Sequence, residues 1–127
     1  MSKLVFDASA ALAHLHKEPG GDVFGRDSAD GALSAVNHAE VFANLIEHGV
    51  TFDQASYTLE RLGYDVLEAD QHRAQEAGAL LARVRRRGVS LADAFCLSLA
   101  RELALPAVTG DRKWKTLDLG VEVTLIR

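Results

Sequence analysis

The alternation of short apolar runs with helix-forming segments constrains the fold of this chain more than any other feature. Residues typical of strands occupy five runs: Leu4–Phe6, Ala32–Val36, Tyr64–Leu67, Pro106–Thr109 and Val121–Ile126. Helical spacing of apolar residues follows in the segments that begin at Ala8, Asn37, Thr51, Asp70 and Ser90, with a short helix around Val23–Arg26. Strands that alternate with helices imply a largely parallel sheet covered on both faces. The sequence therefore predicts an α/β fold with α/β/α layers and a mainly parallel five-stranded sheet.

Residue types at the segment ends predict where several helices begin and end. Asn37 is expected to cap the helix that follows it, and Thr51 with Gln54 matches a capping box. A long helix is expected over Asp70–Arg87, followed by a more buried one over Ser90–Ala104.

Length and composition predict one globular domain, residues 1–127, with 48% apolar and 25% charged residues. Cys96 is the only cysteine, so neither an internal disulfide nor a thiolate metal site is available, and a cytoplasmic setting is expected. No apolar run resembles a signal peptide or approaches the roughly 18 residues of a membrane helix, so no membrane partner is expected.

Four acidic residues stand at positions where carboxylates help catalysis and hinder folding. Asp7 and Asp111 end apolar strand-like runs, while Glu40 and Asp93 lie among apolar residues in helical segments. In parallel sheets, ligands bind beyond the carboxyl ends of the strands. Carboxylates gathered there raise one another's pKa unless cations lie between them. Together the four acids predict a site for a hard divalent cation, Mg²⁺ or Mn²⁺.

Each acid also has a structural interpretation that the sequence leaves open. Asp7 is compatible with a helix N-cap, and Asp93 with a capping box that starts at Ser90. Asp111 is compatible with a turn, and Glu40 with a solvent-facing position on its helix. The five histidines show no spacing typical of a metal site and are expected on the surface or in the core.

Six stretches along the whole chain resemble PIN-domain proteins of the VapC toxin type, the ribonuclease half of type II toxin-antitoxin pairs. The matching stretches are Val5–Ala10, Glu18–Gly20, Ser34–Val41, Ser90–Ala100, Pro106–Trp114 and Ile126–Arg127. The resemblance implies a PIN-like fold and a Mg²⁺- or Mn²⁺-dependent endoribonuclease. Its catalytic and metal-binding acids map to Asp7, Glu40, Asp93 and Asp111, and its auxiliary polar groups map to Ser9 and Thr109. Some relatives carry a further acid soon after the fourth; here Lys113 follows and Asp118 is the next acid.

The expected reaction is hydrolysis of an RNA phosphodiester by metal-activated water, which leaves 5′-phosphate and 3′-hydroxyl ends. Arg112, Lys113 and Lys115, which follow Asp111, are expected to contact the RNA backbone. Trp114 is more typical of a packing residue. The basic run Arg83–Arg87 suits either RNA binding or the C-terminal end of a helix dipole.

The resemblance also implies protein partners. These are a small VapB-like antitoxin that covers the acidic site, and a second copy of the chain in a homodimer, a heterotetramer or a larger complex. Two alternative functions remain open: a weakly active or inactive PIN-like interaction module, and a metal-dependent phosphatase-like domain. Phosphatases of this sheet type commonly have a second Asp two residues after the first, where this chain has Ser9.

Overall fold

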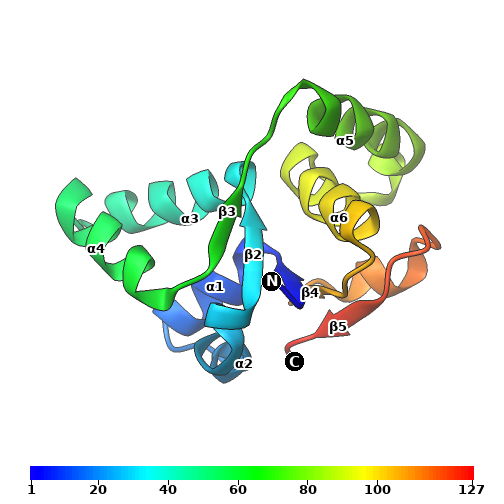
Figure 1. Ribbon diagram of the computed structural model, residues 1–127. Coiled ribbons are helices and arrows are strands. Elements are labelled where there is room, and N and C mark those ends of the chain that lie inside the picture. Colours follow the sequence, from blue (N-terminus) through cyan, green and yellow to red (C-terminus); the bar gives the residue numbers. More distant parts are fainter.

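The computed structural model describes residues 1–127 and is built around one five-stranded sheet (Figure 1). The strands are β1 (Leu4–Phe6), β2 (Gly31–Ser34), β3 (Asp65–Leu67), β4 (Ala107–Thr109) and β5 (Val123–Leu125). Their order in the sheet is β3-β2-β1-β4-β5, and every neighbouring pair is parallel. The predicted α/β fold with a mainly parallel five-stranded sheet is confirmed.

Helices cover both faces of the sheet (Figure 1). They are α1 (Ala8–Leu15), α2 (Gly21–Asp27), α3 (Ala35–Glu47), α4 (Phe52–Leu62), α5 (Gln71–Val84) and α6 (Leu91–Leu103), with the 3₁₀ turns η1 (Ser28–Asp30), η2 (Arg85–Arg87) and η3 (Arg112–Thr116). Adjacent residues on β1 point to opposite faces, and each enters a separate hydrophobic cluster. Phe6 belongs to the cluster under α1 to α4, and Val5 to the cluster under α5, α6 and η3. The three-layer prediction is therefore confirmed. None of the helices combines the length and apolar character needed to cross a membrane.

The topology places a switch point between β1 and β4. From β1 the chain builds the sheet outward through β2 and β3, and then returns to β1's other side to add β4 and β5. In the β1–β4 register Val5 pairs with Ala107, and the Asp7 amide donates to the Val108 carbonyl at 2.8 Å. Ligands of open parallel sheets bind in the crevice at such a switch point. The residues that directly follow β1 and β4 are therefore in the position typical of a functional site.

The predicted boundary between the second strand and its helix is wrong. β2 ends at Ser34 rather than at Val36, and Ser34 rather than Asn37 caps α3. The Ser34 hydroxyl accepts a hydrogen bond from the Val36 amide at 3.2 Å, so a free N–H group at the helix start is satisfied earlier than expected. Asn37 instead lies inside the helix and is fully buried.

The long helix expected over Asp70–Arg87 is shorter as an α-helix. Asp70 is its N-cap and accepts from the Arg73 amide at 2.9 Å, but the α-helix ends at Val84. A 3₁₀ turn over Arg85–Arg87 follows, and Gly88, with a φ of 81°, ends it in a left-handed conformation that suits glycine. The fifth strand is also shorter than predicted, Val123–Leu125 instead of Val121–Ile126.

Candidate metal and catalytic site

Asp7 lies at the centre of the candidate site, immediately after β1. Its backbone occupies the N-cap position of α1, but its side chain makes no capping bond, so the structural interpretation as a helix cap fails. Instead the Asp7 Oδ2 atom accepts from the Ser9 hydroxyl at 2.7 Å and from the Thr109 hydroxyl at 2.8 Å. Both hydroxyls contact the same oxygen, which leaves Oδ1 without a side-chain partner. Ser9 and Thr109, which the resemblance assigns as auxiliary groups, therefore fix the orientation of this carboxylate.

Burial dominates the electrostatics of Asp7, which is only 6% exposed. Loss of solvent raises the pKa of Asp7, the hydrogen bonds from Ser9 and Thr109 lower it, and the nearby negative charge of Asp93 raises it again, with a net upward shift. An ionised carboxylate in this position is stabilised when a cation replaces the lost water. The environment of Asp7 therefore favours cation binding.

Glu40 joins the site from α3 through a residue that the sequence did not single out as functional. Asn37 donates from Nδ2 to the backbone carbonyl of Ala92 at 3.1 Å and to Glu40 Oε1 at 3.3 Å. Asn37 therefore connects α3 to the start of α6 and holds one oxygen of Glu40. Glu40 is exposed overall, as the structural interpretation expected, but loss of solvent around its carboxylate raises its pKa, with further upward contributions from the charges of Asp7 and Asp93. The i, i+3 spacing of Asn37 and Glu40 on one helix face was the available signal.

Asp93 serves as the capping-box residue of α6 and also contributes charge to the site. Its Oδ2 accepts from the Ser90 amide at 2.9 Å, while its own amide donates to the Ser90 hydroxyl at 3.1 Å. The predicted capping box is confirmed, and it leaves Oδ1 without a hydrogen-bond partner. Cys96 is buried one helical turn after Asp93. Burial raises the pKa of its thiol, and the negative charges of Asp7, Asp93 and Glu40 raise it further. These three carboxylates share one neighbourhood.

Asp111 lies beside this group but faces a cation of the chain. Its amide donates to the Thr109 hydroxyl at 3.0 Å, which ties it to the Asp7 network. Its carboxylate accepts from the Lys113 amide at 3.0 Å and lies 3.5 Å from the Lys113 ammonium group. The charge of Asp111 is not among those that raise the pKa of Asp7. Asp111 is therefore a turn residue, as the structural interpretation expected, at the edge of the acidic group.

The acids do not form a closed metal-binding cluster. No group of three or more His, Cys, Asp or Glu side chains is arranged to hold one ion. The donor set nevertheless fits a hard divalent cation, because Asp7, Glu40 and Asp93 each keep one oxygen that accepts no side-chain hydrogen bond. Mg²⁺ usually retains several waters and takes only one or two carboxylates directly. Histidines do not contribute: His38, for example, is hydrogen-bonded to the Tyr64 hydroxyl at 2.8 Å.

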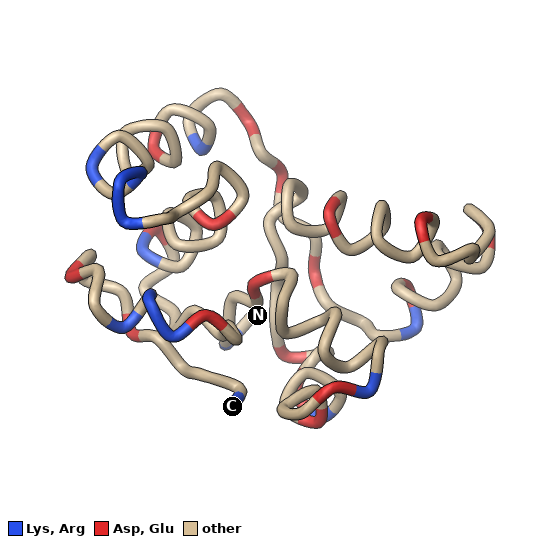
Figure 2. Tube along the Cα trace, turned by 180° about the vertical axis from the view of Figure 1, so that it is seen from behind, with Lys and Arg blue, Asp and Glu red and all other residues tan.

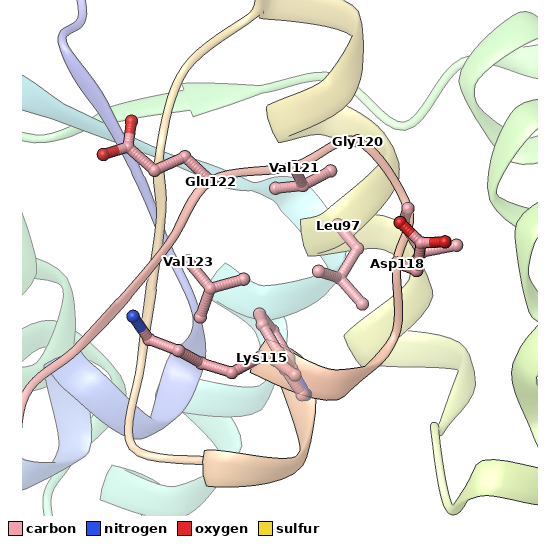
Figure 3. Close-up of a pocket in the computed structure, with 9 residues that line it drawn as sticks. Leu97, Lys115, Asp118, Gly120, Val121, Glu122 and Val123 are labelled. Carbon is pink, nitrogen blue, oxygen red and sulfur yellow. The ribbon is translucent and has the colours of Figure 1, made fainter.

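The basic residues that follow Asp111 separate into two groups. Arg112 and Lys113 lie at the start of η3, next to the acids, whereas Lys115 lines a cavity of about 510 Å³ between η3, α6 and β5 (Figure 3). Asp118 lines the same cavity, and none of the four candidate acids does. Trp114 is 2% exposed and belongs to the core, as predicted for a packing residue.

Comparison with known families and structures gives a consistent assignment. The family model described as PIN domain matches residues 4–119. No protein of curated function is similar enough in sequence to count as a relative. Among solved structures, the DNA-bound VapBC complex of Salmonella typhimurium matches with a TM-score of 0.75 at 19% identity over 100% of both chains.

Two mycobacterial structures are also similar. VapC20 of Mycobacterium tuberculosis, a toxin that cleaves the sarcin-ricin loop, has a TM-score of 0.72 at 16% identity, over 94% of this chain and 98% of that one. VapBC-5 of the same organism has a TM-score of 0.64 at 24% identity over 98% of each chain. At these identities the structural matches establish the fold.

Proposed function

The chain belongs to the PIN domain family, and we propose that it is a Mg²⁺- or Mn²⁺-dependent endoribonuclease, the toxin of a type II toxin-antitoxin pair. The observation that carries the proposal is the grouping of Asp7, Glu40 and Asp93 at the β1–β4 switch point, each with one oxygen that accepts no side-chain hydrogen bond. Three carboxylates in mutual electrostatic contact, one of them buried, destabilise the fold unless a cation offsets their charge. A divalent cation would meet that need and would also attract an RNA phosphate.

Asp7, Glu40 and Asp93 would hold the ion, with Asp111 at the edge of the group. A bound divalent cation supplies Lewis-acid chemistry, because it offsets phosphate charge and makes nearby water more acidic. The Ser9 and Thr109 hydroxyls keep the Asp7 carboxylate in one orientation, and the Ser90 amide does the same for the Asp93 carboxylate. Asn37 holds Glu40, so the free oxygens of the three acids stay in fixed positions. Arg112 and Lys113 supply positive charge to the RNA backbone.

RNA cleavage by matched variants tests this proposal. Wild-type protein is expected to cleave RNA in Mg²⁺ or Mn²⁺ and to lose cleavage in EDTA. Asp93→Asn, which retains a capping side chain but loses the charge, should be inactive. Asp118→Asn removes an acid that lines the separate cavity between η3, α6 and β5, and this variant should remain fully active. Equal activity of Asp93→Asn and wild type would overturn the proposal, as would products with cyclic phosphate ends.

The toxin role adds a protein partner of the VapB type. The structurally similar proteins from Salmonella typhimurium and Mycobacterium tuberculosis include VapBC complexes, which supports an antitoxin for this chain as well. An antitoxin Arg or Lys that reaches the acidic group would occupy the position of the cation. Expression of the chain alone should arrest growth, and co-expression of the small neighbouring gene should relieve the arrest and yield a co-purifying complex. Harmless expression without a partner would contradict the toxin role.

A further inference from the structure

Two basic stretches that are distant in sequence form one surface next to the acidic site. We call this the η2–η3 basic surface; it comprises Arg85, Arg86, Arg87, Arg112 and Lys113. The Arg87 guanidinium donates to the Thr116 hydroxyl at 3.0 Å and to the Thr116 carbonyl at 3.3 Å, so η2 is fastened to η3. Figure 2 shows the basic residues of both turns on the same side of the molecule.

The cations of this surface are mostly unpaired. Arg85, Arg86 and Arg112 are exposed and make no salt bridge or side-chain hydrogen bond, whereas the guanidinium groups of Arg26, Arg73 and Arg101 each lie against an acid. Three consecutive arginines on one 3₁₀ turn repel one another. The helix dipole does not explain them, because Arg83 already places a cation in the last turn of α5. A polyanion that binds here would relieve the repulsion.

The surface is continuous with the acids. The Lys113 ammonium group lies 3.2 Å from the Gly88 carbonyl, directly after η2, and 3.5 Å from Asp111 Oδ2. From Gly88 the chain runs two residues to Ser90, the capping partner of Asp93. The acids themselves repel a phosphate backbone, so affinity for RNA has to come from cations beside them. The η2–η3 basic surface is placed to supply it.

We propose that the η2–η3 basic surface is the track that binds the RNA backbone on one side of the scissile phosphate, through charge rather than base recognition. This inference rests on the proposed ribonuclease function and adds η2, far from Asp111 in the sequence, to the substrate site. Arg85 and Arg86 contact phosphates, while Arg87 and Lys113 hold the two turns together.

The salt dependence of RNA binding tests the track. Binding of a fluorescein-labelled single-stranded RNA of mixed sequence is measured by anisotropy over a range of KCl concentrations, in the cleavage-deficient Asp7→Asn background. Arg85→Gln/Arg86→Gln is compared with Arg26→Gln/Arg61→Gln, which removes two exposed arginines from α2 and α4 and lowers the net charge equally. Each lost contact to single-stranded RNA should reduce the slope of log K against log [salt] by about 0.7, so the first double variant should lose about 1.4. The control double variant should keep the slope of its Asp7→Asn parent.

An unchanged slope for Arg85→Gln/Arg86→Gln, or an equal loss in both double variants, would overturn the inference. So would a variant that keeps its RNA slope and loses only capture of the antitoxin, because the surface would then be a protein interface. The proposed function can fail separately. If the wild-type chain binds RNA along this surface but never cleaves it in Mg²⁺ or Mn²⁺, the inference about the basic surface stands and the ribonuclease proposal is contradicted.

Discussion

Replacement of Asp7 by Asn should abolish RNA cleavage and at the same time stabilise the metal-free protein. Folding raises the pKa of Asp7, mainly through burial, so the protonated form is favoured in the folded state. The stability linked to this group is complete below the ordinary carboxyl pKa and is lost as the pH rises through the folded-state value. At neutral pH, which lies above the ordinary carboxyl pKa, the metal-free wild type is therefore less stable than a protein with a neutral side chain at this position. The amide oxygen of Asn can still accept from Ser9 and Thr109, where Oδ2 does now.

The size of the effect follows from two opposing terms. Desolvation of a buried carboxylate costs several kcal/mol, and the charge of Asp93 adds to that cost. The substitution also weakens two hydrogen bonds, because a bond to a charged group contributes about 1 kcal/mol more than one to a neutral group. For the bonds from the two hydroxyls this loss is about 2 kcal/mol in all. We expect Asp7→Asn to raise the free energy of unfolding by about 1 to 3 kcal/mol. In a domain of this size each kcal/mol corresponds to about 4 °C in Tm.

Urea unfolding in EDTA at several pH values measures this difference. Asp7→Asn should be the more stable protein at pH 7, and the gap should close as the pH falls and Asp7 is protonated. Added Mg²⁺ should reverse the order, because a ligand at 1,000 times its Kd stabilises the wild type by about 4.1 kcal/mol while the variant binds it weakly. Lower stability of Asp7→Asn in EDTA at every pH would refute the argument from burial.

Three further predictions concern the acids and the side chains that hold them. Thr109→Val should lower kcat/KM, because Asp7 loses a donor worth about 1.5 to 3 kcal/mol, whereas Thr109→Ser should retain most activity. Asn37→Ala should lower the free energy of unfolding by about 0.5 to 1.5 kcal/mol in urea melts, since the hydrogen bond from α3 to the Ala92 carbonyl is lost, and should reduce cleavage through Glu40. The acid limb of the pH–rate profile should lie above the ordinary carboxyl range, because the pKa values of Asp7 and Glu40 are raised, and more Mg²⁺ should move it to lower pH.

Much of the fold followed from patterns that depend on residue type alone. Short β-type runs between helical segments specified the parallel sheet, and strand-end placement located Asp7 beside the residues after β4. The capping boxes at Thr51 and Ser90 could also be predicted from the sequence, because each depends on local side-chain chemistry.

What the sequence did not specify depends on where side chains point. Asn37 looked like a helix cap because Asn is favoured there, but Ser34 caps α3 and frees Asn37 to connect α3 with α6. Asp111 and Asp7 looked equivalent at two strand ends, yet Lys113 turns toward Asp111 and two hydroxyls turn toward Asp7. The contact between η2 and η3 depends on the hydrogen bond from Arg87 to Thr116, which are 29 residues apart in the sequence. No local sequence pattern predicts such a contact.

Binding of Mn²⁺ in the absence of RNA tests the central claim most directly. The free Mn²⁺ signal in electron paramagnetic resonance, titrated against wild type, Asp7→Asn, Asp93→Asn and Asp118→Asn, reports bound ion without any cleavage step. We predict that wild type and Asp118→Asn remove Mn²⁺ from solution equally, and that the other two variants bind it at least about tenfold more weakly, as expected when a charge of the site is lost. Equal binding by all four proteins, or by none, would contradict a metal site built from the acids at the switch point.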